Sequence, residues 1–192
     1  MADVFDGKMI VFTAPSGAGK TTVVQHLLKK FDFLGFSISA TTRDKRPKEK
    51  EGKDYYFLSI EDFKSKRRKR QFVEWEEVYE DQYYGTLRSE VDRLWQEQQH
   101  IVFDIDVKGA RSIKKKYGDQ CLAIFIAPPS LSVLVDRLTN RKTETPASLK
   151  KRIARVKREM KYQDKFDKIL INDLLEVTLE EAECMVEDFI NG

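Results

Sequence analysis

Residues 9–28 read MIVFTAPSGAGKTTVVQHLL, and this stretch decides the fold. An apolar segment of strand length, a loop containing Gly17 and Gly19, and a segment of helical period follow one another directly. In this order, the pattern G-x-x-x-x-G-K-[ST] predicts a loop that binds phosphate groups. The alternative is an ordinary glycine-containing turn before a helix, but Lys20 followed by two threonines favours the phosphate loop.

The predicted loop would bind the phosphates of a nucleoside triphosphate. Its glycines let backbone N–H groups turn inward around phosphate oxygens, and the following helix aims its positive dipole end at the same anion. Lys20 is expected to reach the β- and γ-phosphates, and the Thr21 hydroxyl to ligate Mg²⁺. The triphosphate site is predicted to comprise Ala14, Pro15, Ser16, Gly17, Ala18, Gly19, Lys20, Thr21 and Thr22.

The first glycine of the pattern is replaced by Ala14 in this chain. A residue before proline is biased towards extended backbone angles, where a Cβ atom is tolerated. Since Ala14 precedes Pro15, we expect the loop to keep its shape. A phosphate loop occurs in motor, switch and kinase proteins alike, so the rest of the chain must identify the class.

Apolar runs of strand length alternate with segments of helical period along most of the chain. This alternation predicts an α/β fold, in which a central parallel sheet is flanked by helices. The predicted strands show little polar alternation, as expected of strands covered on both faces. The strands are predicted at 8–13, 35–39, 100–106, 121–127 and 167–172, and the helices at 20–31, 88–99, 107–117, 130–140, 147–164 and 175–190.

Two polar segments interrupt this alternation. Residues 40–86 are polar and aromatic, with short strand-like pieces around a basic helix, and are predicted to form an insertion that carries a binding site. The sequence NRKTETPAS at 140–148 is a polar loop between two helices, where Thr145 and Pro146 make a good cap and first turn. We predict that this loop acts as a hinged lid. The basic run at 64–70 is expected to be a solvated helix face.

The composition argues against several classes of protein. The 192 residues suit one domain, and 35 Lys and Arg against 32 Asp and Glu give a net charge of +3, too small to indicate nucleic-acid binding. No apolar segment is long enough to cross a bilayer, and the first residues lack the layout of a signal peptide. Cys121 and Cys184 have no partner at metal-ligand spacing, so buried thiols in a reducing, cytoplasmic setting are expected.

The insertion contains residues suited to a phosphate monoester. Arg43 and Arg46 lie three apart, beside Ser39, Glu49 and Tyr55. Guanidinium groups donate paired, charge-assisted hydrogen bonds, and a tyrosine hydroxyl adds another donor. The alternative is that both arginines are simply exposed in a polar loop, but the residues that follow favour binding.

Further along the insertion, the sequence FVEWEEVYEDQYYGT at 72–86 places Glu74 between aromatic and apolar residues. An unpaired carboxylate is costly to bury there, so it requires a partner rich in donors. Guanine offers its N1–H and exocyclic amine side by side, whereas adenine lacks this pair. A hydroxyl from Ser39 or Thr86 could donate to the guanine O6. Such a site rejects other bases because its own polar groups would be left unpaired.

Arginines gather around the predicted lid. Arg137 and Arg141 share one helical face at i, i+4 spacing, where two like charges repel unless an anion lies between them. Together with Arg152 and Arg155, they are expected to clamp a transferring phosphoryl group. A solvated basic face paired with local acids such as Glu144 is the alternative, which the phosphate loop disfavours.

The run TTRDKRPKEKEGKDYYF at 41–57 resembles the signature segment of the guanylate kinase family, and the resemblance covers nearly all of the chain. It implies phosphoryl transfer from ATP to GMP, giving ADP and GDP, in purine nucleotide metabolism and GMP recycling. It also implies a single domain with a P-loop NTPase-type three-layer fold, a mixed α+β GMP-binding insertion and a small helical lid. The core would comprise 1–39, 87–136 and 157–192, the insertion 40–86 and the lid 137–156.

The resemblance also assigns residues to the site. The residues implied to hold GMP are Ser39, Arg43, Arg46, Glu49, Tyr55, Glu74, Tyr84 and Thr86. Asp104 and Asp106 would lie beside the acceptor and the Mg²⁺. Thr21 and Asp104 would hold this ion. The adenine would lie near Arg137 and Asn172. The residues expected to act on the transferring phosphoryl group are Lys20, Arg43, Arg137, Arg141 and Arg152. Near Tyr79–Gln82 the chain is one residue longer than the family pattern.

Two other functions fit parts of this pattern. A kinase for another nucleoside monophosphate is disfavoured by Glu74 and by the segment from Ser39 to Tyr55. A catalytically silent guanylate-kinase-like module that binds a phosphorylated peptide is disfavoured because Lys20, Thr21 and the lid arginines are present. The partners expected of the kinase are ATP and GMP, with dGMP as a further candidate acceptor, and neither a nucleic acid nor a membrane. A monomer and a homo-oligomer both remain open.

Overall fold

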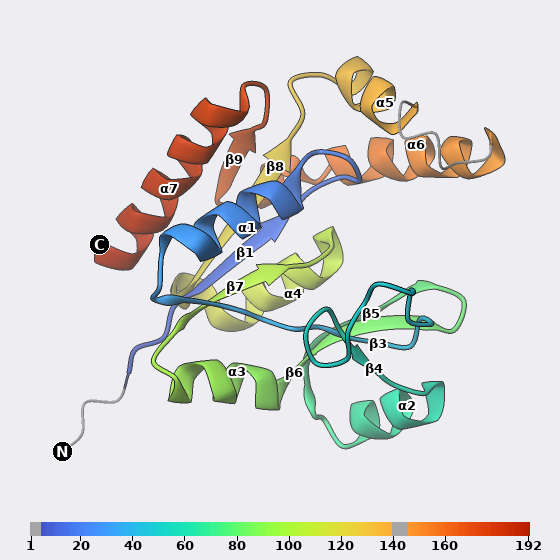
Figure 1. Ribbon diagram of the computed structural model, residues 1–192, viewed down its shortest axis with the longest axis vertical. Helices are drawn as coiled ribbons and strands as arrows, with labels where there is room; N and C mark the ends of the chain where they lie inside the picture. Colours follow the sequence, from blue (N-terminus) through green and yellow to red (C-terminus); the bar gives the residue numbers. More distant parts are fainter. Residues whose placement is uncertain (1–4, 140–145) are drawn as a thin grey trace. The chain divides into compact units, whose positions relative to one another are not determined.

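The computed structural model describes residues 5–139 and 146–192, leaving aside the side chains of 146–150. Its backbone forms two compact units, and Figure 1 labels most of their helices and strands. The first unit contains residues 33–101 and the segment before Lys8, and the second contains residues 8–32 and 102–192. The division falls inside strand β7 (His100–Asp104), which begins in the first unit and ends in the second.

The second unit is a parallel sheet with helices, as the alternation of strands and helices predicts. Its strands lie in the order β7-β1-β8-β9. β1 pairs in parallel with β8, and β8 pairs in parallel with β9. The strands are β1 (Met9–Thr13), β8 (Cys121–Ala127) and β9 (Lys168–Ile171), and the helices are α1 (Lys20–Lys30), α4 (Val107–Tyr117), α5 (Leu131–Thr139), α6 (Pro146–Met160) and α7 (Leu175–Asn191), with short 3-10 helices at Gly118–Gln120 and Gln163–Lys165.

Strands β1 and β8 are buried along their whole length, which explains their continuous apolar sequences. The expectation of cover on both faces is wrong for β9, where Ile169 is 40% and Ile171 is 54% exposed while Leu170 is fully buried. Register places Ile169 opposite Phe125, against whose cluster Met160 packs. This cluster covers Phe125 in β8 but leaves Ile169 and Ile171 of β9 partly exposed, because β9 is the edge strand of the sheet.

The two cysteines have different environments. Cys121 is buried in β8, and this burial raises the pKa of its thiol to about 12. Cys184 is exposed on α7, so the expectation of a buried thiol is wrong at this position. The helix buries Ala182 and Val186, which lie one turn apart, and therefore directs Cys184 outward. Within the described ranges, no helix is long and apolar enough to span a membrane.

The first unit contains a separate four-stranded sheet in the order β4-β3-β6-β5. β3 and β4 are parallel, whereas β6 pairs antiparallel with both β3 and β5. The predicted strand-like pieces and basic helix correspond to β4, β5 and α2, but the sequence pattern does not predict β3 or β6. The elements are β2 (Leu34–Phe36), β3 (Ala40–Thr41), β4 (Tyr56–Phe57), α2 (Ile60–Arg68), β5 (Phe72–Tyr79), β6 (Gln82–Leu87) and α3 (Arg88–Gln96).

Helix α2 covers one face of this sheet. The ring of Phe63 stacks on Phe72 and Tyr83, with centroids 4.3 Å and 5.3 Å apart, and Ala40 completes the cluster. The helix begins where the Ser59 side chain accepts a hydrogen bond from the Asp62 N–H at 3.0 Å, as an N-cap does. The face of the sheet that α2 covers therefore forms the core of the first unit, and the side chains on the opposite face do not belong to this core.

Replacing Phe63 by alanine is expected to lower the free energy of unfolding by about 3–5 kcal/mol, because it removes a fully buried ring from the core of the first unit. Denaturant unfolding followed by circular dichroism measures this change. Phe33, which is 38% exposed, provides the matched control, and its replacement by alanine should cost clearly less. Equal losses for the two variants would contradict this assignment of the core.

Candidate functional site

The phosphate loop lies between the end of β1 and the start of α1. Gly17 and Gly19 have φ angles of 91° and 94°, in the left-handed region that side chains rarely adopt. A Cβ atom at Gly19 would lie 2.1 Å from the Asn172 Nδ2 atom, so glycine is required there for space as well. Ala14 is not among the described residues with positive φ, which fits the expectation that its Cβ is tolerated.

A side chain from the end of β9 supports this loop. The Asn172 amide is buried, and its Nδ2 donates a hydrogen bond of 2.7 Å to the Ala18 carbonyl. The backbone carbonyl of Asn172 in turn accepts two hydrogen bonds of 3.3 Å from the Arg137 guanidinium. Sequence analysis associates Asn172 and Arg137 with the adenine, but gives no sign of this bond to the loop, because the partners are 154 residues apart.

Lys20, Thr21 and Asp104 meet at the carboxyl end of β7. The Lys20 ammonium lies 2.5 Å from Asp104 Oδ1 and donates to the Ile105 carbonyl at 2.9 Å. The Thr21 hydroxyl lies 3.5 Å from the other Asp104 oxygen. A hydroxyl and a carboxylate are oxygen ligands of the kind that Mg²⁺ takes when nucleotide phosphates and water complete its coordination. Among the described residues, no group of three or more His, Cys, Asp or Glu side chains could hold a metal ion alone.

The other acidic residue of this segment, Asp106, caps a helix. Its Oδ1 accepts hydrogen bonds from the backbone N–H groups of Lys108 and Gly109, at 3.0 Å and 2.9 Å. These bonds fix the start of α4 directly after β7. The structure therefore gives Asp106 a role in local folding in addition to the one predicted beside the acceptor.

Of the predicted lid arginines, Arg152 lies at the phosphate loop. Its guanidinium donates to the Ser16 hydroxyl at 3.2 Å, across 136 residues of sequence. Arg155, in contrast, pairs with Glu159 one turn along α6, at 2.6 Å. Arg141 and Thr145 lie outside the described residues. The structure thus brings Arg137 and Arg152 to the loop and its support, and directs Arg155 towards a local acid.

Five of the predicted acceptor residues, Ser39, Tyr55, Glu74, Tyr84 and Thr86, share one face of the four-stranded sheet. In the strand register, Glu74 lies opposite Thr86, and Tyr84 lies opposite Thr41. Because successive side chains alternate between faces, these residues project from the face opposite Phe63. Thr41 pairs with Phe57 across the parallel strands β3 and β4. Ser39 lies two residues before Thr41 and Tyr55 two residues before Phe57, so Ser39 and Tyr55 fall on the same face as that pair. The register of the sheet therefore brings these five residues together.

Glu74 is 8% exposed and has the hydroxyl partner expected of a buried carboxylate. Its Oε1 accepts a hydrogen bond of 2.8 Å from the Thr86 hydroxyl on the neighbouring strand. The two-residue turn before β6 contains Asp81 with a φ of 57°, and the register shifts between Glu77 and Tyr79. The extra residue expected near this turn does not disturb the pairing of Glu74 with Thr86, because the register shift at Glu77–Tyr79 lies between this pair and the turn.

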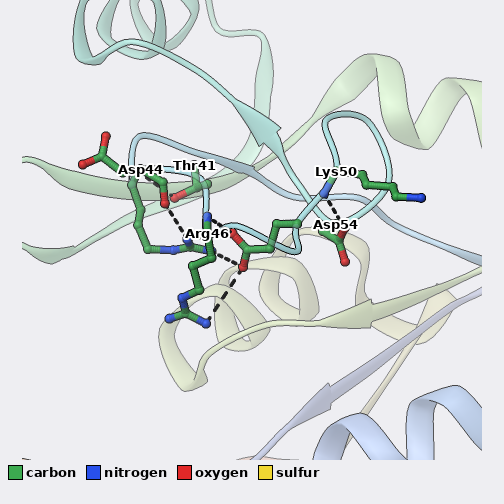
Figure 2. A network of polar contacts seen from close by, with 7 residues as sticks. Thr41, Asp44, Arg46, Lys50 and Asp54 are labelled. Atoms are coloured by element: carbon green, nitrogen blue, oxygen red, sulfur yellow. Dashed lines mark hydrogen bonds and ion pairs between the residues drawn. The ribbon is translucent and has the colours of Figure 1, made fainter.

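The loop after β3 is organised around Glu49. Figure 2 shows the polar contacts of this loop, with Asp44 and Arg46 labelled. Arg43 donates two hydrogen bonds to Glu49, at 2.8 Å and 2.9 Å, and a third to the Asp44 carbonyl at 2.6 Å. The Arg43 guanidinium also lies over the Tyr55 ring, 5.2 Å from its centroid. Arg46 donates its backbone N–H to Glu49 at 2.8 Å, while its side chain is 72% exposed. Arg43 is therefore held by several contacts, whereas the Arg46 guanidinium is exposed and makes only a longer ion pair with Glu49, at 3.9 Å.

This pairing changes the ionisation of both groups. The Arg43 hydrogen bonds, followed by the backbone N–H of Arg46, hold the pKa of Glu49 at about 2, well below the usual 4.5. The Glu49 carboxylate also raises the pKa of Arg43, more than partial burial lowers it. Glu49 is therefore ionised throughout the physiological range and holds Arg43 in place.

A phosphate loop at the end of a parallel strand, with an acidic residue at the end of the neighbouring strand, defines a P-loop nucleotide-binding protein. A family model described as guanylate kinase matches residues 6–189. The guanylate kinase of Porphyromonas gingivalis is 47% identical over 184 residues, which cover 95% of this chain and 98% of that protein. That of Bacteroides thetaiotaomicron is 44% identical over 185 residues, covering 96% and 91%. The chain belongs to the guanylate kinase family.

A solved structure agrees with this assignment. The crystal structure of guanylate kinase from Anaplasma phagocytophilum matches with a TM-score of 0.73 and 25% identity, covering 95% of this chain and 85% of that one. Membership of the family confirms the predicted P-loop NTPase-type α/β fold and the kinase class. The roles of individual residues remain predictions.

Replacing Gly19 by alanine is expected to weaken ATP binding about tenfold, because the new Cβ would displace the Asn172 amide and strain a left-handed backbone. Isothermal titration calorimetry with ATP measures the effect. Ala14→Gly serves as the control, since Ala14 lies in the same loop without a positive φ, and should bind ATP as the wild type does. Equal affinity in the Gly19→Ala variant would refute the proposed need for glycine.

The Glu49 carboxylate is expected to titrate near pH 2 in the folded protein. Replacing Arg43 by methionine should raise the pKa of Glu49 towards its usual value of 4.5, although the Arg46 backbone N–H still lowers it. Because the folded pKa is depressed, the stability from this pair is complete above the unfolded pKa and is lost as pH falls towards 2. Carbon-detected NMR of the Glu49 carboxyl follows the titration. A wild-type midpoint near 4.5 would show that the pair does not form in solution.

Proposed function

We propose that this chain transfers the γ-phosphoryl group of ATP to GMP, giving ADP and GDP, with the individual residues acting as set out below. The observation that carries this assignment is the single sheet face that displays Glu74, Thr86, Tyr84, Ser39 and Tyr55. This face combines a buried carboxylate with hydroxyl groups, beside the arginine-bearing loop of the same unit. A base and a monoester phosphate each find suitable partners there.

For the acceptor base, Glu74 accepts hydrogen bonds from the guanine N1–H and exocyclic amine. A hydroxyl has one hydrogen, and that of Thr86 is directed to Glu74. Thr86 therefore orients the carboxylate, and the Ser39 hydroxyl remains the donor for the guanine O6. The base is selected because adenine would leave Glu74 without its paired donors.

For the acceptor phosphate, Arg43, Arg46, Tyr55 and Tyr84 supply the donors. Arg43 is held in advance by Glu49, while the exposed Arg46 moves to meet the anion. Glu49 thus serves binding by holding Arg43 rather than by facing the phosphate, since two anions repel. We expect dGMP to be accepted as well, because no residue of this set requires the ribose 2′-hydroxyl.

For the donor, backbone N–H groups from Ser16 to Thr21 surround the phosphates, and Lys20 neutralises their charge. Thr21 and Asp104 hold the Mg²⁺, which neutralises phosphate charge when it is bound with ATP. Arg137 and Arg152, with Arg141 of the lid, stabilise the transferring group. Asp106 fixes the start of α4 after β7, and Asn172 supports the loop through its hydrogen bond to the Ala18 carbonyl.

The chemistry needs positioning and charge neutralisation more than covalent participation of a side chain. No general base is assigned. Water must be excluded, because an open site would hydrolyse ATP, and this is the role proposed for the lid at 137–156 together with the insertion at 40–86. A cytoplasmic setting in purine nucleotide metabolism fits the two free cysteines, one of them exposed.

Replacing Lys20 by alanine is expected to lower kcat about 1,000-fold, because the charge at the transferring phosphoryl group is lost. Replacing Glu74 by alanine should leave ATP binding intact and raise KM for GMP about 100-fold, because the guanine donors and Thr86 lose their acceptor. Glu80→Ala, in the exposed turn of the same hairpin, is the control. A coupled assay that detects ADP measures all three variants.

The same assay tests the alternatives. AMP, CMP and UMP should each be poor acceptors beside GMP, and efficient phosphorylation of one of them would assign a different monophosphate kinase. A wild-type protein that binds GMP but forms no ADP would support a silent binding module. Unchanged GMP kinetics in Glu74→Ala would remove the account of base selection given above.

A further inference from the structure

Helix α3 contributes a buried carboxylate that the proposed chemistry does not use. Glu90 lies in the first turn of α3 and is 2% exposed. An ionised carboxylate is costly to bury unless it is paired and hydrogen-bonded. Its surroundings therefore show what this residue holds together.

Glu90 accepts hydrogen bonds on both oxygens from three different segments. Oε1 accepts from the Ile38 backbone N–H at 3.0 Å and from Arg93 at 2.8 Å. Oε2 accepts from the Tyr56 hydroxyl at 3.0 Å and from Arg93 Nε at 3.2 Å. Burial and then the Glu90 carboxylate raise the pKa of Tyr56, so the hydroxyl keeps its proton and donates. Arg93 neutralises the carboxylate. The hydrogen bonds from the Ile38 N–H and the Tyr56 hydroxyl, called the two ties below, connect Glu90 to the segment that leads into β3 and to β4.

These two ties reach the residues next to the acceptor site. Ile38 directly precedes Ser39, and Tyr56 directly follows Tyr55. The two segments join each other at this level through the Tyr56 N–H, which donates to the Ser39 carbonyl at 2.9 Å. β3 and β4 have only two residues each, so few backbone hydrogen bonds hold them in register.

Glu90 contacts the sheet from the side opposite the acceptor. The Tyr56 ring packs against the core cluster of Ala40 and Phe63, on the face covered by α2. Ser39 and Tyr55 are on the other face, because neighbouring residues in a strand point in opposite directions. A side chain that binds Ile38 and Tyr56 from the core side can act on the acceptor only through the backbone of Ser39 and Tyr55.

We propose that Glu90 is a positioning residue of the acceptor site: it fixes the spacing of Ser39 and Tyr55 and thereby sets the affinity for the acceptor monophosphate. The inference rests on the proposed function, since it assumes that this sheet face binds GMP. Small displacements of groups that bind a substrate have large effects on rate and affinity. Loss of the ties should therefore affect the acceptor while leaving the ATP site of the second unit unaltered.

The chain provides a matched control for the charge of this cluster. Glu97 pairs with the same Arg93, at 2.9 Å, but its side chain is 49% exposed and the structure gives it no bond to Ile38 or Tyr56. Glu97→Gln therefore removes a carboxylate from the Arg93 network without releasing β3 or β4. Tyr56→Phe removes one tie and keeps the buried ring, which protects the core.

The experiment compares Glu90→Ala, Glu90→Gln, Tyr56→Phe and Glu97→Gln with the wild type by steady-state kinetics and by calorimetric titration of GMP and of ATP. Glu90→Ala is expected to raise KM and Kd for GMP about tenfold, with kcat and the ATP constants within about twofold. Glu90→Gln should restore part of the affinity, because an amide oxygen still accepts from Ile38. Tyr56→Phe should raise KM for GMP about threefold, and Glu97→Gln should leave it unchanged.

Several results would overturn the proposal. If Glu90→Ala lowers the melting temperature but leaves the GMP constants unchanged, Glu90 has a structural role only. Wild-type affinity for GMP in Tyr56→Phe would also contradict the proposal. Parallel loss of ATP affinity would indicate general damage. If the wild type binds GMP without forming ADP, the proposed reaction fails, while the GMP titrations still decide the role of Glu90. If the wild type does not bind GMP, both proposals are wrong.

Discussion

The hydrogen bond from the Asn172 amide to the Ala18 carbonyl joins the edge of the parallel sheet to the phosphate loop. The Asn172 N–H donates to the Ala127 carbonyl at 2.8 Å, so the amide is itself placed by the sheet. Gly19 must lack a side chain because this amide occupies the space beside it. The loop is thus held in place by a side chain from another part of the sheet.

In the first unit, the alternation of side chains separates stability from recognition. Residues such as Ala40 and Tyr83 pack with α2, whereas Glu74 and Tyr84 project from the other face. A change on one face need not disturb the packing of the other. The backbone is the only part common to both, so any residue that fixes the backbone influences both faces. Glu90 holds the backbone in this way.

The sequence predicts the phosphate loop and its flanking elements well because their signals are local. Gly17, Lys20 and the adjoining apolar runs lie within about twenty residues of one another, the span over which periodic patterns are informative. β1 and α1 appear at the predicted places for this reason. The class of acceptor follows from a similarly local signature at 41–57.

Features that depend on distant contacts could not be predicted in this way. β3 consists of two residues and exists only through pairing with β4 and β6. The exposure of Ile171 arises because β9 is an edge strand, which an apolar pattern cannot indicate. Glu90 looks like an ordinary helical glutamate until Ile38 and Tyr56 are brought to it, and no spacing in the chain reveals that contact.

The two arginines of the acceptor loop differ in conformational entropy. Arg43 is held by Glu49 and lies over the Tyr55 ring, so its loss of rotamer freedom, about 2 kcal/mol for an arginine, occurs on folding and not on binding. Arg46 is 72% exposed and its ion pair with Glu49 is longer, at 3.9 Å, so its side chain is less constrained before it contacts an anion. The loop therefore combines a preorganised donor, which confers directionality, with an exposed one, which widens the range of directions from which an anion can be bound.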